Sequence, residues 1–318
     1  MTRRVAAVDC GTNSLRLLVA DVDLARAELT DVARRMEIVR LGQGVDQTGR
    51  LAPEALARTA GVLRDYADVI AATAARSVRM VATSATRDAS NTAEFTRQVK
   101  EILGVAPEVL TGSEEALLSF TGATAELAAA GDSGPYLVAD IGGGSTEFVL
   151  GNVVPRRDGP PRAISVNIGC VRMTERHLHD DPPGSRQVAD AIADIDAALD
   201  MVSDAVPVGQ ARTLIGLAGS VTTVAAIAIG LPAYDPVSIH HARVSAADVH
   251  EVTRSLLAQT RAARAEIGVM HPGRVDVIGG GALVLDRIMK RFGFGEVLAS
   301  EHDILDGIAW SLARESRD

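Results

Sequence analysis

The sequence predicts an α/β fold built from two domains of common architecture. Segments typical of strands alternate with segments typical of helices along the chain. The length of 318 residues corresponds to about two domains of roughly 150 residues each. A strand-turn-strand pattern, VAAVDCGTNSLRLLVADV at residues 5–22, returns as YLVADIGGGSTEFVLGNV at residues 136–153. This spacing indicates a duplicated domain, because the repeats of solenoid proteins are much shorter.

The first half of the chain alternates between apolar runs and helical patterns. Pro53 opens one of the helical patterns, as suits a first helical turn. We expect strands at residues 5–10, 15–22 and near 37–41, a helix at 53–76, a strand from 77 that runs into a loop, and helices at 91–103 and 113–129.

The second half repeats the opening hairpin and then becomes mostly helical. We expect a polar helix at residues 185–203, an uncharged strand and helix within 213–234, helices at 246–257 and 261–267, a third glycine turn at 277–282 and a last helix at 303–314. The uncharged segment is long enough to span a bilayer. Its glycines and Pro232 favour a buried strand, turn and helix instead.

A cluster of breakers, Gly131 to Pro135, marks the expected boundary between the domains. We expect domains at residues 1–125 and 126–302, with the C-terminal helix 303–318 as a candidate to pack on the first. We predict no export signal, because polar residues interrupt the apolar N-terminus at Asp9.

Charge and cysteine content narrow the classes of partner. With 32 Lys and Arg against 41 Asp and Glu, the net charge is −9, the wrong sign for coating nucleic acid or an anionic membrane. We therefore predict neither partner, and any polyanionic ligand must meet a local basic site. Lys100 and Lys290 are the only lysines, so this site must use arginine. Cys10 and Cys170 form no metal-binding pair, which fits the reducing cytoplasm.

The repeated turn is the first candidate site. An alignment of its two copies without gaps places Asp9 over Asp140, Gly11 over Gly142 and Ser14 over Ser145. A strand that ends in Asp and enters a turn of small residues leaves backbone N–H groups to face an anion, and the carboxylate suits Mg²⁺. One such turn is more often an ordinary β-turn, but two at matching positions favour phosphate binding. Asp140 and, on the facing turn, Asp9 are the candidate metal ligands.

Further acids stand near these turns. Glu114 and Glu115 open a helix, where they complement its dipole or supply a base that deprotonates water. Glu147 lies across the second turn from Asp140 and is either a second metal-linked carboxylate or an exposed strand acid. The sequence leaves these alternatives open.

Other residues carry weaker signals. Arg87 follows a buried strand and is either a phosphate contact or a loop arginine. Arg16 is a weaker candidate at the repeat position of Glu147. The segment VIGGGALVL, with Gly279, Gly280 and Gly281, lacks a dinucleotide fingerprint and is either a packed turn or a nucleotide contact. The paired histidines lack a third ligand at zinc spacing.

Seven segments in order resemble the exopolyphosphatase and guanosine pentaphosphate phosphohydrolase family. They are DCGTNSLRLLV, RLGQGVDQTGRL, VATSATRDASN, TGSEEALLSFTG, DIGGGSTEF, IGLAGSVTT and VIGGGALVL. The resemblance runs from about residue 4 to 312. It implies two ribonuclease H-like domains of the actin-like ATPase type flanking a cleft, and hydrolysis of terminal phosphates assisted by Mg²⁺ and stimulated by K⁺.

The resemblance also implies roles for single residues. Glu115 takes the position of the catalytic base, with Glu114 as its neighbour, and Asp140 and Glu147 match catalytic or metal-linked acids. The matches to phosphate-binding positions are Asn13, Ser14, Arg87, Gly142, Gly143, Gly144 and Ser145. Helix packing in the family implies a homodimer.

Three functions follow as alternatives. The first is an exopolyphosphatase; because longer family members carry further helical domains after the point where this chain ends, we expect it to prefer short polyphosphate. The second removes the 5′-phosphate of guanosine pentaphosphate, pppGpp. The third is a nucleotide-binding regulator with little turnover, against which the acids Glu115, Asp140 and Glu147 argue.

Overall fold

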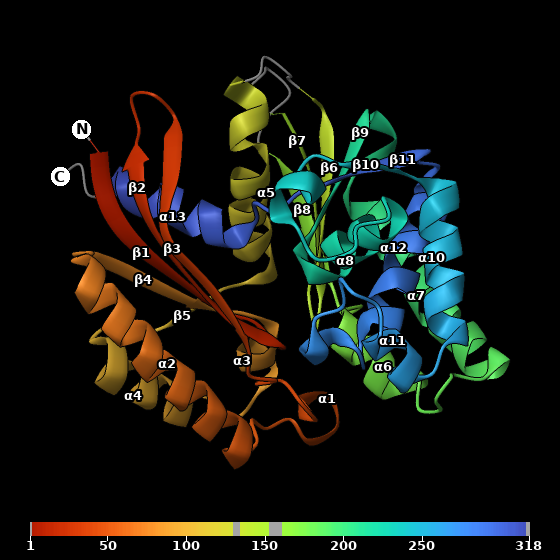
Figure 1. Ribbon diagram of the computed structural model, residues 1–318, viewed down its shortest axis with the longest axis horizontal. Helices are drawn as coiled ribbons and strands as arrows, with labels where there is room; N and C mark the ends of the chain where they lie inside the picture. The colour runs from red at the N-terminus through yellow and green to blue at the C-terminus, as the bar shows by residue number, and fades with distance from the viewer. Residues whose placement is uncertain (1, 130–133, 153–160, 316–318) are drawn as a thin grey trace. The chain divides into compact units, whose positions relative to one another are not determined.

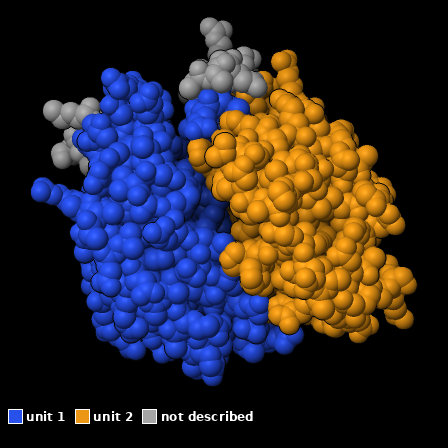
Figure 2. Space-filling model, viewed as in Figure 1, with its two compact units in different colours: residues 1–131, 303–318 blue, residues 132–302 orange. Residues whose placement is uncertain are grey.

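The computed structural model describes residues 2–129, 134–152 and 161–315 and forms two compact units, coloured separately in Figure 2. Unit 1 comprises Met1–Gly131 and Asp303–Asp318, and unit 2 comprises Asp132–His302. Each unit contains one sheet (Figure 1). Part of the breaker cluster, residues 131–133, and the last residues 316–318 lie outside the described residues.

The sheet of unit 1 has the strand order β3-β2-β1-β4-β5. Its strands are β1 (Thr2–Cys10), β2 (Ser14–Asp23), β3 (Glu28–Ile38), β4 (Ser77–Ala82) and β5 (Glu108–Val109). The first three strands form an antiparallel meander, and β4 and β5 continue the sheet in parallel with β1. This is the topology of a ribonuclease H-like domain.

Helices cover both faces of this sheet (Figure 1). They are α1 (Val45–Thr48), α2 (Pro53–Thr73), α3 (Ser84–Asp88), α4 (Thr92–Leu103), α5 (Gly112–Ala129) and α13 (Ile304–Glu315). Alternation along β1 assigns the faces: Ala6, Val8 and Cys10 join the core with α2 and α4, whereas Val5 and Ala7 join the core with α13. The C-terminal helix therefore belongs to the fold of unit 1.

The sheet of unit 2 repeats this order as β8-β7-β6-β9-β11, with β10 added at the edge. Its strands are β6 (Tyr136–Ile141), β7 (Thr146–Gly151), β8 (Arg162–Val166), β9 (Thr213–Leu217), β10 (Arg243–Ser245) and β11 (Glu296–Ala299). Again the first three strands are antiparallel and the next two parallel. The predicted α/β class with two ribonuclease H-like folds is confirmed.

The helices of unit 2 build its main core against β6 and β7. The longer ones are α6 (Cys170–His177), α7 (Ser185–Ala205), α8 (Ala218–Ala228), α10 (Ala246–Ala258) and α12 (Ile278–Phe292), and the shorter ones are η1 (Val208–Gln210), α9 (Pro236–Ile239), α11 (Arg261–Ala265) and η2 (Pro272–Arg274). The uncharged segment forms β9 and α8, as predicted. Among the described residues no helix is long and apolar enough to cross a membrane.

Three element predictions were wrong. After the strand that begins at residue 77, residues 84–88 form the short helix α3 and not a loop. The third strand occupies Glu28–Ile38 and not residues 37–41. It pairs only with β2 and is largely exposed, so its sequence lacks the apolar alternation that the prediction relied on. Residues Gly279 to Gly281 form the first turn of α12 and not a loop. A Cβ on Gly281 would lie 2.1 Å from Ser220 Oγ, so here glycine allows close packing.

Candidate active site

The first repeated turn, Gly11 to Ser14, joins β1 to β2 in unit 1. The Gly11 N–H donates to Ser14 O over 3.0 Å and closes the turn. The turn's carbonyl groups accept bonds from the backbone that follows β3: Thr12 O from Gly42 N at 2.8 Å, and Asn13 O from Val39 N at 3.0 Å and Arg40 N at 2.8 Å. The backbone after the third strand therefore fixes the turn's orientation.

The second turn, Gly142 to Ser145, has the same construction in unit 2. The Gly142 N–H donates to Ser145 O over 3.0 Å. The first N–H groups of α6 bind its carbonyls: Cys170 N donates to Gly142 O at 2.9 Å, and Val171 N and Arg172 N donate to Gly143 O at 2.9 and 3.1 Å. The Arg172 side chain donates from Nε to Gly144 O over 2.6 Å.

Holding the carbonyls sets the direction of the N–H groups. In a planar trans peptide the N–H of the next residue points opposite to the carbonyl. Within the described part of the chain, the N–H groups of Gly143, Gly144 and Ser145 in unit 2, and of Thr12 and Asn13 in unit 1, have no protein partner. Such groups of N–H donors can bind anions, so each turn has the backbone geometry of an anion site.

Two carboxylates stand beside the turn of unit 2. Asp140 at the end of β6 is paired directly across the ladder with Glu147 on β7, and both are buried. Ser165 on β8 donates to Glu147 Oε1 over 2.6 Å. Directly opposed side chains lie about 5 Å apart at Cβ, and like charges there are unfavourable. Two buried carboxylates at this spacing are oxygen ligands that fit a divalent cation such as Mg²⁺.

The equivalent position of unit 1 carries the opposite charge. Asp9 is paired across the ladder with Arg16, whose Nη2 and Nε lie 2.6 and 3.0 Å from Asp9 Oδ2. Arg16 also pairs with Asp303. Asp9 Oδ1 is buried and has no hydrogen-bond partner among the residues described. Burial raises the pKa of Asp9, although Arg16 opposes the shift.

The two acids at the start of α5 have different surroundings. Glu114 accepts bonds from Thr111 N at 2.8 Å and Thr111 Oγ1 at 2.7 Å, and these bonds lower its pKa. Glu115 is buried and pairs with Arg87 Nη1 at 3.1 Å, which also donates to Leu110 O. Glu114 therefore caps the start of the helix, and Glu115 is the buried acid that pairs with an arginine.

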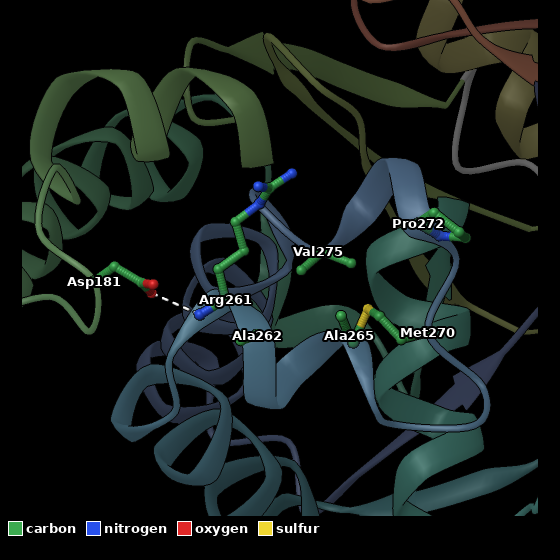
Figure 3. Close-up of a pocket in the computed structure, with 7 residues that line it drawn as sticks. All are labelled: Asp181, Arg261, Ala262, Ala265, Met270, Pro272 and Val275. Carbon is green, nitrogen blue, oxygen red and sulfur yellow. Dashed lines mark hydrogen bonds between the residues drawn. The ribbon is translucent and has the colours of Figure 1, made fainter.

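A pocket of about 510 Å³ lies in unit 2 (Figure 3). It is lined by Asp181, Arg261, Ala262, Ala265, Met270, Pro272 and Val275. None of these is a predicted site residue. The buried Arg264 connects the pocket to α12, because its Nη2 lies 3.2 Å from Asp181 Oδ1 and its Nη1 would lie 3.4 Å from a Cβ on Gly279.

The predicted residues divide between the units. Unit 1 contains Asp9, Asn13, Ser14, Arg87 and the pair Glu114 and Glu115, whereas unit 2 contains Asp140, the turn 142–145, Glu147 and Gly279 to Gly281. Sequence reasoning missed Arg172 and Gly169. For Gly169 a signal was present, because a glycine directly before a helix follows the third strand of the repeat. A Cβ on Gly169 would lie 2.3 Å from Gly143 O, so only glycine lets α6 reach the turn.

Comparison with known proteins decides the family. Residues 18–315 match the Ppx/GppA phosphatase family. The chain belongs to this family. It is 52% identical to Exopolyphosphatase 2 of Mycobacterium tuberculosis over 98% of both chains. It is 28% identical to the guanosine-5′-triphosphate,3′-diphosphate pyrophosphatase of Aeromonas salmonicida, covering 98% of this chain and 60% of that protein.

A solved structure supports the same assignment. The crystal structure of an exopolyphosphatase-like protein is 44% identical and superposes with a TM-score of 0.94, covering 100% of this chain and 99% of that one. The family and the enzyme class predicted from the motifs are thereby confirmed: the chain is a phosphoanhydride hydrolase of the Ppx/GppA family. A regulator without turnover is not favoured.

Proposed function

We propose that this Ppx/GppA family member removes the terminal phosphate of inorganic polyphosphate. The observation that carries the substrate is the 52% identity to Exopolyphosphatase 2 along 98% of both chains. The relatives named for guanosine pentaphosphate are at 27–30% identity, and this chain spans 45–60% of their length. The turns with unpartnered N–H groups suit a substrate that is entirely phosphate.

The proposed roles follow from each residue's surroundings. In unit 1 the N–H groups of turn 11–14 and the Arg87 guanidinium bind and orient phosphoryl oxygens, and in unit 2 the N–H groups of turn 142–145 do so. Glu115 takes a proton from the attacking water, whose oxygen forms a bond to the terminal phosphorus while the bridging P–O bond breaks. Asp140 and Glu147 would hold Mg²⁺, which supplies neutralisation of phosphoryl charge when bound.

A second substrate, pppGpp, is favoured by the pocket in unit 2. Its volume suits a nucleoside, and its floor of Ala262, Ala265, Met270 and Val275 is apolar, as a base requires. Asp181 also lines it; its Oδ1 accepts from the Arg261 N–H over 2.7 Å (Figure 3), and its second carboxylate oxygen would accept from base N–H groups. If this pocket takes guanine, Ala265→Trp lowers the rate with pppGpp and leaves the rate with polyphosphate unchanged.

The cellular setting also belongs to this proposal. Both cysteines are buried free thiols, which supports a cytoplasmic enzyme. The homodimer, K⁺ stimulation, a preference for short chains and a lack of nucleic-acid partners stay predictions from the resemblance and the acidic charge.

The test is Mg²⁺-dependent phosphate release from short polyphosphate, long polyphosphate, pppGpp and ATP in parallel. We expect release chiefly from polyphosphate. Glu115→Gln should lower kcat about 10²- to 10⁴-fold, as for loss of a general base. Glu114→Gln is the matched control on the neighbouring acid and should stay within about threefold, because its carboxylate is bound to Thr111. Release chiefly from pppGpp makes the second substrate the principal one, and no release from any of the four contradicts the proposal.

A further inference from the structure

We infer that Arg172 is a positioning residue for phosphate release, fixing the peptide between Gly144 and Ser145 so that the Ser145 N–H faces the phosphoryl group. The inference rests on the proposed function of turn 142–145. Nothing in the sequence motifs assigns Arg172 a role.

The geometry around Arg172 is that of a support behind the turn. Its side chain belongs to α6 and the residue is only 9% exposed. Its Nε donates to Gly144 O over 2.6 Å, and its own backbone N–H donates to Gly143 O over 3.1 Å. The Gly144 carbonyl therefore points toward α6, and the N–H of Ser145, in the same planar peptide, points the opposite way.

Unit 1 shows what Arg172 replaces. By the repeat, Asn13 O corresponds to Gly144 O, and two backbone groups, Val39 N and Arg40 N, hold Asn13 O. Across the described ranges no backbone N–H donates to Gly144 O. The same peptide is thus held by backbone in one unit and by a side chain in the other.

The guanidinium also adds charge where the turn needs it. A hydrogen bond from a charged donor is shorter and stronger than one from a neutral donor, which fits the 2.6 Å distance to Gly144 O. A buried positive charge behind the turn raises the affinity of its N–H groups for an anion on the other side. Geometry and charge are separable by substitution.

The experiment compares two neutral variants that lose the same charge. Arg172→Gln keeps an N–H donor at the bond position of Nε, whereas Arg172→Met keeps the length and has no donor. We expect kcat/KM with polyphosphate to fall about 10- to 100-fold in R172M, as for loss of an outer-shell support, mainly through kcat. R172Q should recover at least half of this loss on a logarithmic scale. The matched control R176M removes the half-buried arginine that pairs with Asp194 one turn along α6 and should stay within about twofold.

Thermal unfolding of each variant separates positioning from stability. A purely structural role would lower the Tm and leave kcat per folded molecule unchanged. Equal losses in R172M and R172Q, or wild-type kinetics in R172M, would overturn the inference.

A binding measurement keeps this inference distinct from the proposed function. In the wild type, tripolyphosphate should shift the amide NMR signals of Gly143, Gly144 and Ser145. In R172M the Ser145 shift should shrink most, and an unchanged shift would contradict the role of Arg172. If wild-type protein releases no phosphate from polyphosphate, the proposed function fails while this titration still decides the positioning. If both neutral variants fail to fold, R172K, which keeps the buried charge, replaces them in the titration.

Discussion

The turn after Asp9 and the turn after Asp140 share a backbone and differ in charge. Both close with the same glycine-to-serine hydrogen bond, and both have carbonyls held by the backbone that follows the third strand. Across the ladder, however, Asp9 faces Arg16, whereas Asp140 faces Glu147. The first turn carries its own counter-charge, and the second carries two acids.

Under the proposed function, this difference separates anion binding, which both turns share, from cation binding, which only the second turn would perform. The shared backbone is what an anion requires, so both turns retain it. Under the proposed function, one ladder position decides whether the Asp beside the turn faces an arginine, as Asp9 faces Arg16, or faces a second acid with which it would bind a cation, as Asp140 faces Glu147.

The largest effect should follow from giving the second turn the charge pair of the first. In Glu147→Arg, an arginine faces Asp140 as Arg16 faces Asp9, so the cation should lose its site. We expect kcat to fall about 10³-fold. In the isosteric control Glu147→Gln, the Mg²⁺ concentration for half-maximal rate should rise about 10- to 100-fold. Circular dichroism checks the fold, and a folded E147R with unaltered Mg²⁺ dependence contradicts this account of the second turn.

An intermediate effect should follow from adding a methyl group to the backbone that packs against each turn. In Gly169→Ala the new methyl meets the backbone of Gly143 at 2.3 Å, whereas in Gly42→Ala it meets the side chain of Thr12 at 2.3 Å. A side chain can rotate away from the new methyl group, but backbone cannot. We therefore expect G169A to lose about 1 to 3 kcal/mol of stability and about tenfold in kcat/KM. G42A should lose less stability and less activity than G169A. Urea unfolding and phosphate release measure these losses.

The control for this pair is Gly61→Ala within α2, where a Cβ meets no atom within 4 Å. It should stabilise the protein by about 0.5 to 1 kcal/mol. Equal losses of stability and activity in G169A and G42A would contradict the expected difference between a contact with backbone and a contact with a side chain.

The smallest effect concerns the buried Asp9. Burial raises its pKa in the folded protein above that of the unfolded chain, so at neutral pH the ionised carboxylate disfavours folding. This penalty fades as the pH falls through the folded pKa and is absent below the unfolded value. Asp9→Asn should therefore raise the Tm at pH 7, by an amount that shrinks toward pH 4. Calorimetry without Mg²⁺ measures the difference, and a gap independent of pH would rule out this origin.

Much of the fold followed from the repeat. The alignment of Asp9 with Asp140 predicted two related sheets, and their strand orders agree. The third strand was misplaced because ELTDVARRMEI lies at a sheet edge, where side chains on both faces reach solvent and can be polar. Such a strand lacks the alternation of apolar and polar residues. The Gly279 to Gly281 run was misassigned because glycine serves both turns and close helix packing, which a sequence does not distinguish.

The candidate site was predictable in part. The turns were recognisable from residue type and spacing, and the family resemblance placed Glu115 at the position of the base. The contacts that give the two acids different surroundings, Glu114 with Thr111 and Glu115 with Arg87, are not encoded in any local pattern. Arg172 was beyond reach for the same reason: its partner, Gly144 O, is a backbone atom 28 residues away. Roles set by tertiary contacts require the fold.

The place of α13 in unit 1 has a consequence for the order of synthesis. This helix joins the core formed by Val5, Ala7 and Leu18 on one face of the first sheet, yet the ribosome makes it after residues 132–302. At about 5 to 20 residues per second, those residues take roughly 10 to 30 s to add. During that interval the nascent first unit exposes the apolar surface that α13 later covers, and this surface is where a chaperone would bind the growing chain.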